Sequence, residues 1–315
     1  MTGPIGVLAM AYGTASGPED IERYYTDIRG GRTPSPELLA ELARRYAAIG
    51  NGFPLLEITK RQAARLEREL NAGRPGGFRV YLGMKHSAPS IAQGVALMRA
   101  DGIERAVGLV LAPHYSRLSV GGYIERAEAA VAEAEGWAPS LTFVRNWHDH
   151  PLFIEALAAR VRDALERLDP PERERAAVVF SAHSLPARIA DEGDPYPDQL
   201  RETADLVGAS LGLDETITAW QSAGRTPELW LGPDLADVIS DMAAAGRSAV
   251  VVCACGFVAD HLEILYDLDI EAAKAARDSG IRFVRTESMN DDPAFIVALA
   301  VVVREHLAAE IPTLG

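Results

Sequence analysis

The segment from Gly256 to Glu271, called the acidic segment below, concentrates side chains that could bind a metal ion. If it forms a helix, Glu263, Asp267 and Glu271 recur every four residues and share one face. Like charges at this spacing repel by about 0.2–0.5 kcal/mol per pair. No Lys or Arg lies between Asp260 and Glu271 to offset that repulsion. A divalent cation passing along the carboxylates would explain the pattern, and a solvated acidic face is the alternative.

The residues before this segment place it at the end of a strand. The apolar run 249–255 leads through Gly256 into Asp260, His261 and Glu263. Another apolar run, 176–181, leads into His183. Ligands of open α/β sheets bind beyond the carboxyl ends of the strands. This arrangement puts both His183 and Glu263 at positions where such sheets keep their sites.

Composition sets the class of protein. The chain has 315 residues, of which 48% are hydrophobic and 24% charged, as in a globular protein of two ordinary domains. Its net charge of −14 argues against nucleic acid as a partner. No apolar run approaches the roughly 18 residues of a membrane span, and no signal peptide is recognisable at the start. We therefore expect a cytoplasmic protein.

The sequence contains an internal repeat. Residues 149–161 and 291–303 both begin with Asp, have Pro two positions later and continue with apolar residues at helical spacing. Each copy follows a similar series of short apolar runs, which predicts strands at 6–11, 78–83, 106–112 and 141–144, and again at 176–181, 216–220, 248–252 and 281–284. Strands that alternate with amphipathic helices indicate parallel sheets.

The repeat predicts an α/β fold of two similar Rossmann-like domains with a cleft between them. Each domain would have a four-stranded parallel sheet with helices on both faces. The expected domains are 1–150 and 151–315, and the last helix could pack back on the first domain. Aligning the halves makes Tyr12 equivalent to His183, so the two side chains could address opposite faces of one ligand.

Several motifs together resemble the ferrochelatases, which insert ferrous iron into porphyrins. The matching segments run in order along residues 5–305 and include 10–14, 19–25, 111–116, 181–186, 193–198, 220–224 and 256–271. The resemblance implies a chelatase-like fold around a porphyrin. Fe²⁺ would then be a substrate and not a resident cofactor.

The resemblance also implies roles for individual residues. His183 and Glu263 match the catalytic pair and would also contact the metal, with Tyr12 on the axial side. Asp267 and Glu271, on the carboxylate spacing described above, could deliver metal. The positions expected around the porphyrin are Tyr12, Arg29, Arg45, Tyr46, Phe53 and Tyr123. Whether His183 or Glu263 removes the pyrrole protons is left open by the sequence.

The substrate is the finer question. The compact chain with Tyr12 in place favours coproporphyrin III. Phe53 replaces a hydroxyl residue and Gly30 replaces an Arg that relatives often carry, which leaves protoporphyrin IX as an alternative. A cobalt chelatase is a further alternative, but these enzymes usually use two histidines, so Glu263 argues against it. A non-catalytic haem or porphyrin carrier would not need the acidic segment, so that segment argues against a carrier. We expect a monomer whose partners are porphyrin and iron, with at most transient contacts to other haem-pathway enzymes.

The two cysteines predict that no iron–sulfur cluster is bound. Cys253 and Cys255 are the only cysteines of the chain, whereas a cluster generally takes four protein ligands. In a strand, their side chains would point to opposite faces. When both are replaced by Val and the protein is purified without air, the variant should be as active and as colourless as the unaltered protein. Bound sulfide with visible absorbance in the unaltered protein would contradict this prediction.

Overall fold

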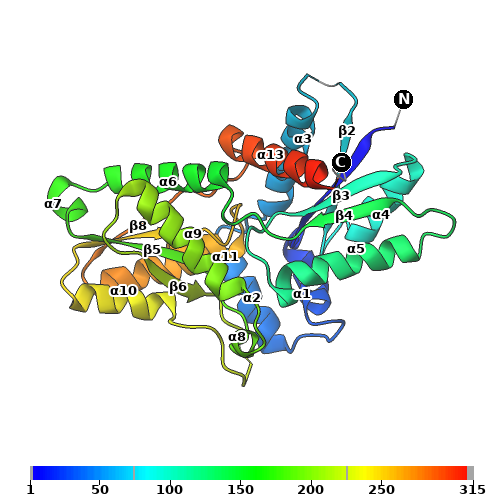
Figure 1. Cartoon of the computed structure of the whole chain (residues 1–315). Helices are drawn as coiled ribbons and strands as arrows, with labels where there is room; N and C mark the ends of the chain where they lie inside the picture. The colour runs from blue at the N-terminus through cyan, green and yellow to red at the C-terminus, as the bar shows by residue number, and fades with distance from the viewer. Residues whose placement is uncertain (1–2, 74, 225, 311–315) are drawn as a thin grey trace. The chain divides into compact units, whose positions relative to one another are not determined.

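Two sheets of four parallel strands organise the chain (Figure 1). The structure, a computed structural model, describes residues 3–73, 75–224 and 226–310. Its contacts divide the chain into two units. As far as they are described, Met1–Pro113, Arg117–Trp147 and Asn290–Gly315 form the first unit, and His114–Ser116 and His148–Met289 form the second.

The first unit is a sheet between two helical layers. Its strands, in the spatial order β2-β1-β3-β4, are β1 Ile5–Ala11, β2 Phe78–Met84, β3 Arg105–Val110 and β4 Ser140–Val144. Helix α3 packs with α13, and α4 packs with α5, which gives one pair for each face (Figure 1). The helices are α1 Ile21–Ile28, α2 Pro36–Ala48, α3 Leu55–Leu70, α4 Ile91–Ala100, α5 Gly122–Ala132 and α13 Pro293–Ala309, with a 3₁₀ turn η1 Pro18–Asp20 and a π turn η2 Arg117–Gly121.

The second unit repeats this plan. Its strands, in the order β6-β5-β7-β8, are β5 Ala176–His183, β6 Ile217–Gln221, β7 Ala249–Cys253 and β8 Arg282–Arg285. Helix α6 packs with α9, and α10 packs with α12. The helical segments are α6 Pro151–Glu166, α7 Pro170–Arg173, α8 Arg188–Asp191, α9 Tyr196–Leu211, α10 Leu235–Ala244, α11 Leu262–Leu265, the π turn η3 Asp267–Ala272 and α12 Ala273–Asp278.

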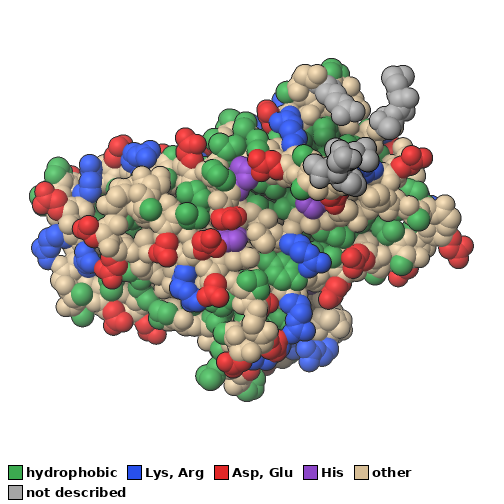
Figure 2. Space-filling view, viewed as in Figure 1, with side chains coloured by type: hydrophobic (Ala, Val, Ile, Leu, Met, Phe, Trp, Pro, Cys, Tyr) green, Lys and Arg blue, Asp and Glu red, His purple; other side chains and the backbone are tan. Residues whose placement is uncertain are grey.

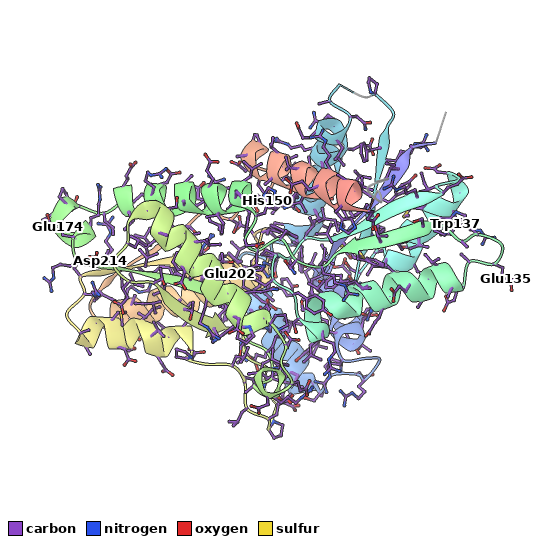
Figure 3. All side chains as sticks on the ribbon, viewed as in Figure 1. Glu135, Trp137, His150, Glu174, Glu202 and Asp214 are labelled. Carbon is purple, nitrogen blue, oxygen red and sulfur yellow. The ribbon has the colours of Figure 1, made fainter. Side chains whose placement is uncertain are left out.

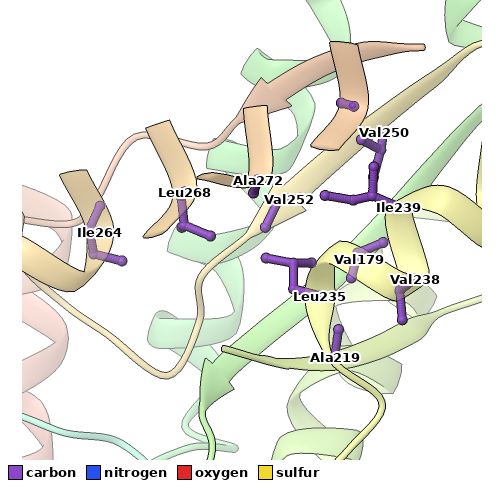
Figure 4. Packing of buried hydrophobic residues seen from close by; sticks show 11 residues of the cluster. Val179, Ala219, Leu235, Val238, Ile239, Val250, Val252, Ile264, Leu268 and Ala272 are labelled. Atoms are coloured by element: carbon purple, nitrogen blue, oxygen red, sulfur yellow. The ribbon is translucent and has the colours of Figure 1, made fainter. Parts of the chain in front are cut away.

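The sequence explains why these elements form where they do. Every residue of β7 is buried, as expected for an inner strand of a parallel sheet covered on both faces. Figure 4 shows how β5, β6 and β7 pack through Val179, Ala219 and Val252 against apolar residues of the neighbouring helices. Both repeated Asp-x-Pro segments start helices with Pro at the first position, at α6 and α13.

The eight strands and the parallel sheets confirm the predicted fold class. The last helix contacts α3, β3 and β4, and the Phe295 ring lies 5.9 Å from that of Trp147, so α13 belongs to the first unit's core. Among the described residues, no helix combines the length and hydrophobicity that crossing a membrane requires.

The acidic segment differs from the single helix expected from the sequence. It consists of the short α11, the π turn η3 and then α12. The amide of Glu271 bonds to the carbonyl of Tyr266 at 3.0 Å, five residues back, as in a π-helix. The three carboxylates therefore do not form a regular α-helical column.

Candidate functional site

His183 is the last residue of β5 and is held there from two sides. Its backbone pairs with Gln221 on β6, and the hydroxyl of Tyr196 donates to its carbonyl at 3.0 Å. Ring nitrogen Nδ1 bonds to the carbonyl of Ser184, which leaves Nε2 to face Glu263. The distance from His183 Nε2 to Glu263 Oε1 is 3.7 Å. The structure thus brings together the two residues that the sequence singled out.

Glu263 reaches His183 because the chain turns tightly after β7. The amide of Gly256 bonds to the carbonyl of Ser181 on β5 at 3.1 Å. A Cβ on Gly256 would lie 2.5 Å from Cβ of Ala182, closer than packed atoms approach. The buried Gln221 secures the next turn, since its Nε2 donates to the Glu263 carbonyl at 3.3 Å and its Oε1 accepts from Ser181 at 2.8 Å.

His261 completes a triad that sequence reasoning did not assign. Its Nε2 lies 3.4 Å from Glu263 Oε2, and its Nδ1 lies 2.9 Å from the carbonyl oxygen of Ala259. Burial lowers the pKa of His261, but the Glu263 carboxylate, the hydrogen bond to the Ala259 carbonyl and the charge of Asp267 together outweigh burial and raise the pKa above its usual value. The Glu263 carboxylate therefore lies between two imidazoles. Such a cluster can exchange protons and ligate a cation.

The other acidic residues differ in burial. Asp267 is only 7% exposed and accepts a hydrogen bond from the Ser222 hydroxyl, whereas Glu271 is exposed. Ser222 adopts φ of 61°, a left-handed conformation that is unfavourable for a residue with a side chain. The loop after β6 thus keeps a strained conformation in which the Ser222 hydroxyl reaches Asp267.

Arg285, at the end of β8, contacts the acidic segment at two points. Its guanidinium makes a two-pronged contact with Asp269, at 2.7 and 3.0 Å, and lies 3.5 Å from Asp260. Ser288 adds a bond of 2.7 Å to Asp260. The paired geometry and the low exposure of Arg285, 16%, indicate a rigid support for the loop that carries Glu263.

The first unit places Tyr12 beside a buried histidine. Tyr12 follows β1 and is 38% exposed, and its ring centre lies 4.6 Å from that of His86, which follows β2. His86 Nδ1 lies 2.6 Å from an oxygen of Asp27. Burial lowers the pKa of His86 to about 4, so the ring is neutral at physiological pH. A neutral ring donates from Nδ1 to the carboxylate and supports Tyr12 without adding charge.

The remaining residues expected at the porphyrin lie in the first unit with unequal exposure. Tyr46 and Tyr123 are 2% and 4% exposed. The Tyr46 ring stacks on that of Phe53 at 4.5 Å, while Lys85 lies 4.7 Å above the ring of Tyr123. Arg45 is 3.5 Å from Glu41, and Arg29 lies 5.7 Å from the centre of the Tyr25 ring. Both arginines are partly exposed.

Fold and site together define a chelatase-like protein. The sirohydrochlorin chelatase SirB of Bacillus subtilis subspecies spizizenii, solved with cobalt, has the same fold, with a TM-score of 0.60 over 98% of this chain and 97% of that one at 12% identity. The chain also matches the family model "Ferrochelatase" over residues 4–307. It therefore belongs to the ferrochelatase family.

Curated relatives resemble the chain throughout its length. A coproporphyrin III ferrochelatase of Anoxybacillus flavithermus is 48% identical, with 97% of both chains covered. The coproporphyrin III ferrochelatase of Bacillus subtilis is 46% identical over 96% of this chain and 98% of its own. A ferrochelatase of Thermus thermophilus is 45% identical over 95% and 98%, respectively.

The low pKa of His86 predicts acid sensitivity of the first unit. An unfolded histidine binds a proton below about pH 6.5, whereas folded His86 resists protonation until about pH 4. The stabilisation is therefore complete above pH 6.5 and is lost as the pH falls toward 4. His86→Gln should flatten the decline in unfolding temperature over this interval. His306→Gln is the control, and equal declines in the original protein and His86→Gln would contradict the assignment.

Proposed function

We propose that this ferrochelatase inserts Fe²⁺ into coproporphyrin III and releases two protons. The observation that carries the proposal is the His183–Glu263 pair, 3.7 Å apart at the strand ends of the second unit. The relatives named coproporphyrin III ferrochelatases, 46–48% identical over 96–97% of the chain, support the choice of porphyrin.

The chemistry requires proton acceptors close to a metal ligand. A free porphyrin carries two N–H groups, and four nitrogens bind the iron once both protons have left. His183 and Glu263 offer two adjacent groups that can accept protons or contact Fe²⁺. Because Glu263 also lies 3.4 Å from His261, a proton taken by the carboxylate has a second imidazole to which it can pass.

Iron supply is the role proposed for the acidic segment. Asp267 and Glu271 follow Glu263 along the chain, and one is buried while the other is exposed. An exposed carboxylate that captures hydrated Fe²⁺ and a buried one that receives it would let the ion lose water in stages. Carboxylate oxygens suit such hard divalent ions.

Porphyrin contacts are proposed for the first unit. Tyr12 offers a partly exposed phenol as an axial group for the metal. Arg29 and Arg45 would pair with propionates, which is favourable for a substrate with four of them. Tyr46, Phe53 and Tyr123 would shape the apolar surroundings. We further propose a cytoplasmic monomer without a tightly bound cofactor, in agreement with the high negative charge and the two cysteines.

Removing either member of the pair should abolish metallation without abolishing porphyrin binding. Loss of a general base costs about 10²–10⁴-fold in rate. We expect His183→Ala and Glu263→Gln each to lose at least this much in single-turnover metallation, and the double variant to be far from additive. Porphyrin fluorescence titration serves as the binding control. Near-normal turnover of His183→Ala would place the active site elsewhere.

Neutralising the acidic segment should weaken iron use selectively. For Asp267→Asn and Glu271→Gln, we expect an increased apparent KM for Fe²⁺ with little change in porphyrin affinity, because only charge on the iron route is lost. Asp237→Asn, an exposed carboxylate on α10, is the matched control. Unchanged iron dependence in both variants would mean that the segment is a solvated surface.

Anaerobic metallation of coproporphyrin III and protoporphyrin IX, measured side by side, tests the proposed substrate. We expect a higher kcat/KM for coproporphyrin III because charge-assisted contacts to four propionates add affinity. A clear preference for protoporphyrin IX would identify the other porphyrin as the substrate. Tight binding of both without turnover would indicate a carrier.

A further inference from the structure

A second group of potential metal ligands lies in the second unit and does not include His183 or Glu263. His148 and Asp149 immediately precede α6, and Glu202 lies on α9, which packs against α6. One potential ligand atom of each residue lies within 4.8 Å of the other two. Figure 3 labels Glu202 on α9 and His150 at the start of α6, and Figure 2 shows histidine and acidic side chains together on this face.

The closest distance in this cluster suits a bound ion. His148 Nε2 and Glu202 Oε2 are 2.9 Å apart. Two ligands with bonds of about 2.1 Å at the tetrahedral angle around one ion are separated by about 3.4 Å. A cation could therefore replace the proton shared by these atoms with little movement. Asp149, whose side chain is 55% exposed, is free to turn toward it.

The backbone holds the imidazole and Glu202 close together without a metal. Thr203, the neighbour of Glu202, donates its hydroxyl to the carbonyl of His148 at 3.0 Å. The same hydroxyl oxygen lies 2.9 Å from Nε2 of the buried His114. The two ligand-bearing segments are thus tied together one residue away from the ligands, which lowers the cost of assembling a site.

The second observation is an unsatisfied ring nitrogen. The His148 side chain is only 6% exposed, and its Nδ1 is buried with no hydrogen-bond partner anywhere in the described part of the chain. This nitrogen faces Oδ1 of Asp149 at 3.9 Å, too far for a hydrogen bond. A buried polar atom without a partner destabilises the folded state. Because no partner donates to Nδ1, this nitrogen can carry the ring proton when Nε2 binds a metal ion.

We propose that His148, Asp149 and Glu202 bind one divalent transition-metal ion such as Zn²⁺, Fe²⁺ or Co²⁺. An imidazole with carboxylates favours these ions over Mg²⁺, which prefers oxygen ligands. The ion would link the start of α6 to α9 and so stabilise the second unit. This site is independent of the porphyrin reaction, because none of its residues belongs to the His183–Glu263 pair or to the acidic segment.

Equilibrium dialysis with Zn²⁺ tests the site in a protein whose active site has been disabled. In full-length His183→Ala/Glu263→Gln, we expect one Zn²⁺ per chain to be bound at least tenfold more tightly than Mg²⁺. Adding Glu202→Gln or His148→Gln should weaken Zn²⁺ binding at least tenfold, and Asp149→Asn should also weaken it. Glu166→Gln, at the far end of α6, removes an equal charge and should have no effect.

Thermal unfolding provides an independent readout. Zn²⁺ should raise the unfolding temperature of the disabled protein but not that of its Glu202→Gln variant. Since the Glu202 side chain is 56% exposed, this substitution should not prevent folding, even if His148→Gln does. Unchanged Zn²⁺ affinity in Glu202→Gln, or equal affinity for Mg²⁺ and Zn²⁺, would overturn the proposal.

Discussion

The close approach of Gly256 to β5 is the constraint on which the site of the second unit depends. The chain leaving β7 must pass directly over Ser181 and Ala182 before it reaches Glu263. Because Gly256 has no side chain, its backbone can bond to Ser181 across that contact. The turn brings a carboxylate to a histidine on the neighbouring strand. Gln221, Arg285 and Ser222 then secure the residues that the turn has brought together.

Much of the fold can be explained by simple sequence periodicity. Short β-branched runs such as that of β7, separated by amphipathic helices, predicted both parallel sheets, and the repeated Asp-x-Pro segments marked the starts of α6 and α13. The same logic placed His183 and Glu263 beyond strand ends, whereas their pairing was expected only from the resemblance to the ferrochelatases. They are close because β5 and β7 are neighbours in the sheet, and parallel strands end at the same edge.

Other features depend on contacts that a single sequence does not display. Asp267 is buried at the start of a π turn, whereas carboxylates spaced by four residues suggest an ordinary helix. Arg285 supports the site from a strand that carries none of the expected site residues. Tyr46 and Tyr123 have the amphipathic character of ligand-contacting residues, yet their rings are largely covered. The cluster around His148 is assembled by packing of two helices about 50 residues apart, and no local motif marks it.

The π turn η3 also limits how the length of the chain can vary. A wide turn accommodates one more residue than an α-helical turn between the same end points. Deleting one residue from 267–272 would let the segment relax into an ordinary helix. Because the end points are unchanged, such a deletion would leave Glu263 directed toward His183. Asp267, which lies in the wide turn itself, would be the carboxylate that moves.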